Sequence, residues 1–211
     1  MKKPLIALAI VALVSGVAMA DKVNKSIRVD MNDQVNRDLS TVNGAIRIDD
    51  GATIDGEAKT VNGSIEIGER VQLDSATTVN GRIVVGQDSE IRGEVMTVNG
   101  SIELEPGARS GEVSTVNGSL TLRGAEVDGD MSTYNGNVYL KDGARLRGNL
   151  IIREPDYSNN NKRDKPLRIY IEDGASIDGD LIVEDDRLEV ELFMNGGSVS
   201  GEIRGNKIKR R

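Results

Sequence analysis

The chain has 211 residues, with 34 acidic against 27 basic side chains, and it contains no Cys, His or Trp. The missing residue types exclude a Ser-His-Asp triad, an imidazole base, a thiol nucleophile, a disulfide framework and a conventional zinc site. The net charge of −7 argues against nucleic-acid binding, and the few aromatic side chains are too few for a base-stacking platform or a sugar-binding cleft. They are Tyr134, Tyr139, Tyr157, Tyr170 and Phe193. The composition therefore predicts a protein that is not an enzyme and that needs no cofactor.

The first 20 residues have the features of a cleaved secretory signal. Lys2 and Lys3 form a basic head, and residues 5–14 are an apolar run too short to span a bilayer comfortably. Residues 18–20, Ala-Met-Ala, form an A-x-A cleavage site. Cleavage there would leave residues 21–211, with a formal charge of 25 − 34 = −9. We therefore expect a periplasmic or secreted protein with no integral membrane span after cleavage.

A tetrapeptide repeat follows the signal. Thr-Val-Asn-Gly begins at residues 41, 60, 78, 97 and 115, and Thr-Tyr-Asn-Gly at residue 133 continues the series, at intervals of 18 or 19 residues. The repeat-defining residues are Asn43, Gly44, Asn62, Gly63, Asn80, Gly81, Asn99, Gly100, Asn117, Gly118, Asn135 and Gly136. Self-similarity at a fixed short period indicates a repeat architecture.

Each repeat contains three short runs of alternating apolar residues, separated by corners rich in Gly, Asn and Asp. In the first complete repeat these apolar residues are Ile46 and Ile48, then Ala52 and Ile54, then Ala58. Alternation with period two in such short runs is typical of strands. The sequence therefore predicts an all-β fold, a single-stranded parallel β-helix (β-solenoid) of about nine coils, with 18–19 residues and three short strands in each coil.

The same apolar columns continue on both sides of the tetrapeptides, so we expect the β-helix to span residues 21–205. Residues 153–166 are polar and lack an apolar period, which predicts a surface loop inserted into one coil. Residues 206–211 form a basic C-terminal tail. Two interpretations of this tail stay open: a frayed, solvated terminus, or a segment attracted to anionic lipid heads, lipopolysaccharide or the acidic flank of another rod.

The Asn-Gly pair suits a corner, because Gly accepts a positive φ, Asn tolerates it, and stacked Asn amides can bond one another along the rod. Two orientations are open for the residues before it. Counting by twos from Val95 places Thr97 and Asn99 inside and Val98 outside, whereas a corner just before Thr97 reverses this. We predict the second orientation, with the valine column in the core, because an exposed row of valines would be an aggregation hazard. An outward Thr and Asn array would resemble ice-binding β-solenoids.

An acidic column precedes the tetrapeptides at Glu57, Glu94, Glu112 and Asp130, interrupted by Ser75. Stacked carboxylates could bind calcium, whose ligands are oxygens, but the calcium-binding repeat motif is missing, so we predict a solvated acidic face. Several β-helices cleave polysaccharides with grouped carboxylates, and the loop around Tyr157 could wall a groove. Here the acids are spread over many columns, so no catalytic, cofactor-binding or metal residue is assigned.

The repeated unit Thr-Val-Asn-Gly-Ser-Ile resembles a bacterial adhesin family of exported β-strand-repeat proteins. The Gly-Ala-x-Ile-x-Gly-(Glu/Asp) element at residues 51–57 and 174–180 also resembles bactofilins, cytoskeletal β-helices that polymerise end to end. The resemblance covers most of residues 24–205 and carries no catalytic motif. It implies a scaffold or adhesion module at the bacterial cell envelope, or alternatively a polymer-forming structural protein. The expected partners are envelope components or further copies of the chain.

Overall fold

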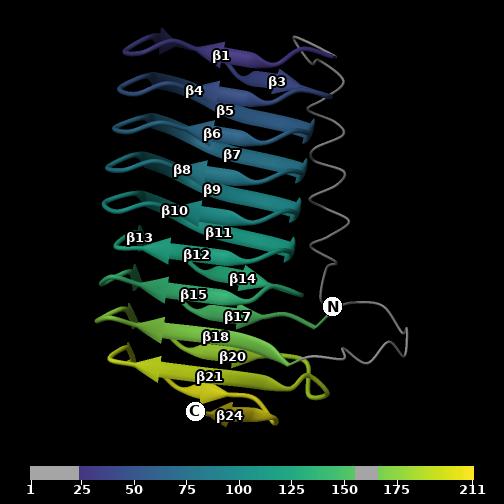
Figure 1. The fold of residues 1–211 in the computed structure, drawn as a ribbon, viewed down its shortest axis with the longest axis vertical. Coiled ribbons are helices and arrows are strands. Elements are labelled where there is room, and N and C mark those ends of the chain that lie inside the picture. The colour runs from purple at the N-terminus through teal and green to yellow at the C-terminus, as the bar shows by residue number, and fades with distance from the viewer. Residues whose placement is uncertain (1–23, 155–165) are drawn as a thin grey trace.

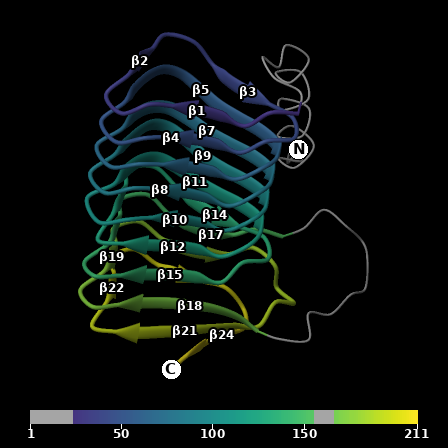
Figure 2. The same cartoon turned by 45° about the horizontal axis from the view of Figure 1, so that its top comes forward.

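The computed structural model describes residues 24–154 and 166–211. The predicted signal, residues 155–165 of the predicted loop, and Tyr157 lie outside the described residues. The described chain winds as a stack of coils into one rod, as Figures 1 and 2 show. All pairs between its strands are parallel, in one sheet of ten strands and one of 14. The predicted parallel β-solenoid of about nine coils is confirmed.

The ten-stranded sheet forms the first face of the rod, with one strand from each coil. Its strands are β1 (Ile27–Val29), β4 (Ile46–Ile48), β6 (Ile65–Ile67), β8 (Ile83–Val85), β10 (Ile102–Leu104), β12 (Leu120–Arg123), β15 (Val138–Lys141), β18 (Leu167–Glu172), β21 (Val190–Asn195) and β24 (Ile208–Arg210). Every strand of this face before β24 places Ile, Val or Leu side chains inward at alternate positions, as the sequence predicts.

The 14-stranded sheet bends along its length and so supplies the other two faces. Its second-face strands are β2 (Gln34–Val35), β13 (Glu126–Val127), β16 (Arg145–Leu146), β19 (Ser176–Ile177) and β22 (Ser198–Val199). Its third-face strands are β3 (Leu39–Thr41), β14 (Met131–Thr133), β17 (Leu150–Ile152), β20 (Leu181–Val183) and β23 (Ile203–Arg204). Four longer strands run across both faces: β5 (Thr53–Asn62), β7 (Gln72–Asn80), β9 (Glu90–Asn99) and β11 (Arg109–Asn117).

These four bent strands differ from the three separate strands predicted for each coil. Their pairing shifts register at the bend, for example between Ile54 and Glu57 of β5, where the chain passes from the second face to the third. A bulge of this kind lets one strand bend while its backbone hydrogen bonds continue on both sides. The corner predicted there is therefore a bend within a strand.

The core is one continuous cluster of inward side chains that runs through the rod. The strand register places residues of the same type beside each other in successive coils. Ile27 lies in register with Ile46, which lies in register with Ile65. The resulting columns of Ile, Val, Leu and Ala are almost wholly buried. Burying them stabilises each coil only through its neighbours, because a single coil has no closed core.

The rod continues past the predicted boundary at residue 205. β24 pairs with β21, so residues 208–210 of the predicted basic tail form the last strand of the first face. The prediction of a separate basic tail is therefore wrong for residues 208–210. Apolar Ile208 packs against the core, whereas Arg210 lies in register with Leu192, at a core column, and is exposed at the end of the rod.

Candidate functional site

The tetrapeptide threonines point into the rod and bond to the coil before. Thr60, Thr78 and Thr97 are fully buried. Their hydroxyls donate to the backbone carbonyls of Gly44, Gly63 and Gly81 at 2.9–3.0 Å. Since a buried hydroxyl must find a partner, the hydroxyl and the glycine carbonyl satisfy each other in these three coils. The prediction that these threonines face outward is wrong, and counting by twos was correct for them.

The tetrapeptide glycines are required by space. A Cβ atom added at Gly63, Gly81 or Gly100 would lie far inside van der Waals contact with the carbonyl oxygen of the glycine one coil earlier. Five of the six have no positive φ, and Gly118, at 159°, is close to fully extended. Positive φ was therefore the wrong reason for these glycines. It applies to other corners, for example at Gly51 and Gly143.

The tetrapeptide asparagines form a ladder on the outside of the rod. Each side-chain amide donates to the side-chain carbonyl of the asparagine one coil earlier, at 2.8–3.0 Å, from Asn135 down to Asn24. All of these asparagines are exposed. The predicted bonding of stacked amides is confirmed. Together with the buried threonines, it gives the repeat-defining residues a structural role.

The valine column lies between these two rows, and the prediction that it joins the core is wrong. Val98 is buried, with 8% of its surface exposed, while Val42, Val61, Val79 and Val116 are half-buried. None of them belongs to the contiguous core cluster. Because Thr97 points inward, the next side chain along the strand must point outward. The valines thus form a partly covered stripe on the third face.

The three faces of the rod differ in how many ion pairs they carry. On the second face Arg109 and Arg147 both pair with Glu126, and on the first face Arg82 and Arg123 both pair with Glu103. On the third face, over residues 75–152, none of the carboxylates Glu94, Glu112 and Asp130 forms an ion pair with another described residue. We call this region the valine face.

The valine face has three outward columns. Its stripe is Val79, Val98, Val116 and Tyr134; its middle column is Thr77, Met96, Ser114, Ser132 and Ile151; its acidic column is Glu94, Glu112 and Asp130. The predicted acidic column is therefore real, and it lies at one edge of this face. The valine face thus combines apolar side chains with carboxylates that lack a cationic partner among the described residues.

Carboxylates of the acidic column also bond within the protein. Asp130 accepts the backbone N–H of Asn149 at 2.8 Å, and Asp38, one coil before Glu57, accepts the N–H of Glu57 at 2.9 Å. Such bonds satisfy the backbone where the chain turns. In the parts of the chain that the structure describes, no group of three or more Asp or Glu side chains could hold a metal ion.

Glu94 differs from its neighbours in this column because its carboxyl is largely buried. Burial raises the pKa of Glu94, a hydrogen bond from the Ser114 hydroxyl at 2.7 Å opposes the rise, and the nearby charge of Glu112 adds to it. The folded protein therefore holds this proton to higher pH than the unfolded chain does. Stability is present at low pH and falls as pH rises through the raised pKa.

We expect Glu94→Gln to raise the melting temperature by a few degrees at pH values above the raised pKa of Glu94, where the buried carboxylate is ionised in the native protein. Gln keeps an oxygen that accepts the Ser114 hydrogen bond. Below the ordinary glutamate pKa of 4.5 the two proteins should melt together. Thermal melts between pH 3 and pH 8 measure this. The control is Glu90→Gln on the exposed start of the same strand, and an equal gain there would contradict the role of burial.

Three of the five aromatic side chains meet on the first face, which sequence reasoning missed. Tyr139 and Tyr170 stack with ring centroids 5.1 Å apart, and Tyr170 and Phe193 with centroids 4.7 Å apart, with ring planes within 9° of parallel. Each ring covers its neighbour's face, and Lys141 lies 5.6 Å from the Tyr139 ring centre. The faces between the rings are therefore occupied by the stack itself, whereas a sugar or base would need a free ring face to stack on. Its effect is to hold the last coils in register.

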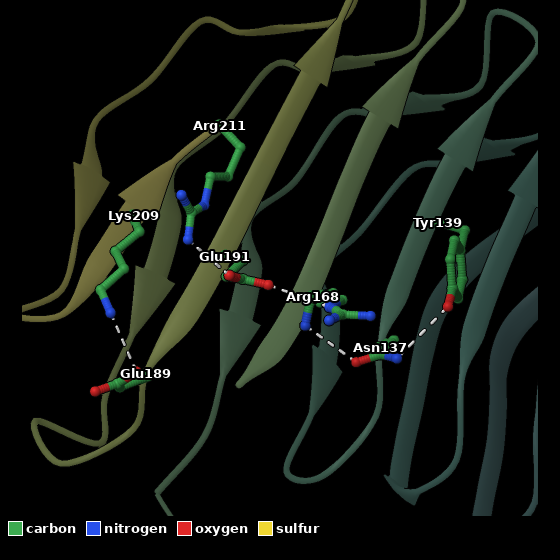
Figure 3. Close-up of polar contacts among 7 residues, drawn as sticks. All are labelled: Asn137, Tyr139, Arg168, Glu189, Glu191, Lys209 and Arg211. Carbon is green, nitrogen blue, oxygen red and sulfur yellow. Dashed lines mark hydrogen bonds and ion pairs between the residues drawn. The ribbon is translucent and has the colours of Figure 1, made fainter. Parts of the chain in front are cut away.

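Polar side chains also link the last strands of the first face, as Figure 3 shows. Arg168 donates to Glu191 at 3.2 Å, and Arg211 donates to the other oxygen of Glu191 at 3.1 Å. Lys209 pairs with Glu189 at 3.3 Å. The hydrogen bond from Arg211, and then that from Arg168, lowers the pKa of Glu191. Two of the four cations of the predicted tail, Lys209 and Arg211, are thus paired within the rod, which weakens the idea that the tail serves an anionic surface.

The fold and its surfaces define the class of protein as a parallel β-solenoid whose valine face, over residues 75–152, contrasts with the ion-paired first and second faces. Comparison with family models, with curated proteins and with solved structures finds no match to this chain. Among residues 24–154 and 166–211, no helix has the length and hydropathy of a transmembrane span.

Proposed function

We propose that this chain is an exported, non-catalytic β-solenoid that acts as a scaffold or adhesion module at the bacterial cell envelope. The observation that carries the proposal is the valine face. The other two faces carry many ion pairs, while the third, over residues 75–152, presents partly covered valines beside carboxylates that form no ion pair with another described residue. Contiguous apolar surface on a soluble protein is typical of an interaction site. The signal-like residues 1–20 and the resemblance to exported repeat proteins support the location.

The proposal is tested in bacterial cells that express the full chain with a photo-crosslinking residue in place of Val116 or of Thr121. Val116 lies on the valine face and Thr121 on the first face. We expect the chain to fractionate with the periplasm or envelope, to begin at Asp21, and to crosslink to an envelope component only from Val116. A full-length cytosolic chain, or equal crosslinking from both positions, would contradict the proposal.

The enzymatic alternative has its own measurement. Most carboxylates on the first two faces are committed to arginines, for example Asp74 to Arg92 at 2.5 Å and Asp178 to Arg145 at 2.7 Å. A carboxylate held in this way is a poor general acid or base, because the ion pair favours its charged form. We expect no release of unsaturated or reducing sugars from acidic glycans. Clear turnover by the purified chain would contradict the non-catalytic proposal.

The ends of the rod bear on the polymer-forming alternative. Stacking a second copy in register would place its Ile27 on Arg210, its Arg28 beside Arg211 and its Asp38 beside Glu202. A charge on a core column and two contacts between like charges oppose this assembly. The last coil thus resembles the edge strands that natural sheets protect with inward charges.

We expect the wild-type chain to show no end-to-end fibres in negative-stain images. The double variant Arg210→Leu with Arg211→Glu should increase its mass in light scattering, because it removes the charge from the core column and reverses the contact with Arg28. The matched control is Arg145→Leu with Arg147→Glu on the second face. Fibres of the wild-type chain would favour the polymer-forming function instead.

A further inference from the structure

We propose that the valine face docks a basic amphipathic segment of another protein, with its apolar side chains on the valine stripe and its cations on the acidic column. This inference rests on the proposed function and names the chemistry of the partner. A peptide segment fits this face because the apolar row and the anionic row run in parallel along the rod.

The charge of the face selects the sign of the partner. Glu94 and Glu112 lie in register on neighbouring strands, and Asp130 occupies the next coil in the same column. Strand neighbours lie about 4.8 Å apart, so these carboxylates repel one another unless cations approach. None of the three has an ion-pair partner among the described residues, in contrast to carboxylates of the other faces. Lysine or arginine side chains placed along this column would relieve the repulsion.

The spacing of the two rows fits a helix. Glu112 and Val116 are four residues apart on one strand, or about 13 Å at the rise of an extended chain. An α-helix with side chains is about 10–12 Å wide and has a pitch of about 5.4 Å, close to the distance between coils. A helix laid along the rod therefore can place apolar residues at i, i+3 and i+7 over successive valines, and cations over successive carboxylates.

Other occupants fit less well. A second copy that presented the same face in the antiparallel sense would set one acidic column against the other, which like charges oppose. Anionic lipid heads would meet the same repulsion. The middle column adds no charge of either sign, and its Ser114 hydroxyl donates to Glu94 within the face. Charge complementarity therefore favours a basic partner over a second rod or a membrane.

The test measures binding of fluorescent 18-residue helical peptides to the purified chain by anisotropy. One peptide carries leucines and lysines on opposite faces, a second carries leucines and glutamates, and a third carries serines and lysines. We expect binding only of the leucine–lysine peptide, with an affinity that falls as salt is added. Equal binding of the leucine–glutamate peptide, or no binding of the leucine–lysine peptide, would overturn the inference.

Matched variants place the binding on this face. Glu94→Gln with Glu112→Gln should weaken binding about tenfold, because it removes two of the three carboxylates that the lysines of the peptide would meet. Glu90→Gln with Glu105→Gln removes the same charge elsewhere and should leave binding unchanged. Val116→Ser should weaken it, and Val84→Ser on the first face should not. Loss of binding in the control pair as large as in the test pair would overturn the assignment.

The inference and the proposed function fail in different ways. If the peptides do not bind but Val116 still crosslinks to an envelope component in cells, the proposed function stands and the basic partner is wrong. If the chain instead associates with itself in light scattering and Val116→Ser abolishes that association, the face belongs to a second copy and the inference is overturned. Circular dichroism of each variant confirms that its β-structure is intact.

Discussion

Gly100→Ala is expected to lower the free energy of unfolding by about 3 kcal/mol, because the new methyl group would meet the carbonyl oxygen of Gly81, one coil earlier. Neither backbone can move away without breaking hydrogen bonds to its own neighbours. The distortion falls in the middle of the rod, where each coil stabilises the two beside it. Chemical denaturation followed by circular dichroism measures the loss.

Gly143→Ala is the matched control for Gly100→Ala. Gly143 has a φ of 75°, but no atom lies within 4 Å of the Cβ position. Alanine there introduces only backbone strain, about 1 kcal/mol. If conformational freedom were the reason for the tetrapeptide glycines, the order of the two effects would be reversed. A larger loss in Gly143→Ala than in Gly100→Ala would therefore contradict the close-packing explanation.

Thr97→Val should cost about 1–3 kcal/mol, although valine has nearly the same shape. The fully buried Thr97 hydroxyl donates to the Gly81 carbonyl at 3.0 Å, and valine leaves that carbonyl without this partner. Thr121→Val, on the outer surface of the first face, removes an equivalent hydroxyl that is half-buried and should change the melting temperature little. Equal melting temperatures for the two variants would show that the buried bond does not stabilise the rod.

The repeat made the fold predictable because three independent patterns agreed in every coil. The spacing of the tetrapeptides gave the coil length, the alternation of Ile46 and Ile48 gave the inward columns, and the Asn-Gly pairs gave the ladder. Local and global preferences that agree in this way are typical of sequences with one dominant structure. The structure adds the reason for Gly63 and Gly81, which depends on a contact between coils and has no signal within one coil.

Other features were missed because they depend on which coil lies beside which. Tyr139, Tyr170 and Phe193 each follow an inward residue of the first face, but the intervals between them exceed the 18–19 residues of the regular coils. Their alignment is visible only once the extra residues are removed from the count. In the same way, the basic composition of residues 206–211 concealed the alternation of Ile208 and Arg210, so a strand was interpreted as a tail.

The outer ladder of asparagines has a consequence for the chemical lifetime of the protein. Asn-Gly is a dipeptide prone to deamidation, since the unhindered glycine nitrogen can attack the asparagine side chain and close a succinimide ring. In the folded rod the Asn99 amide is bonded to Asn80, and the nitrogen of Gly100 donates to the Asn117 carbonyl at 3.0 Å. Both reacting groups are therefore restrained. A rod that opens one coil exposes that coil's Asn-Gly to irreversible conversion, and the aspartate formed would place a negative charge in the ladder. Each conversion changes the mass of the peptide that contains that Asn-Gly pair. The peptide masses of an aged sample would therefore show which coils have opened.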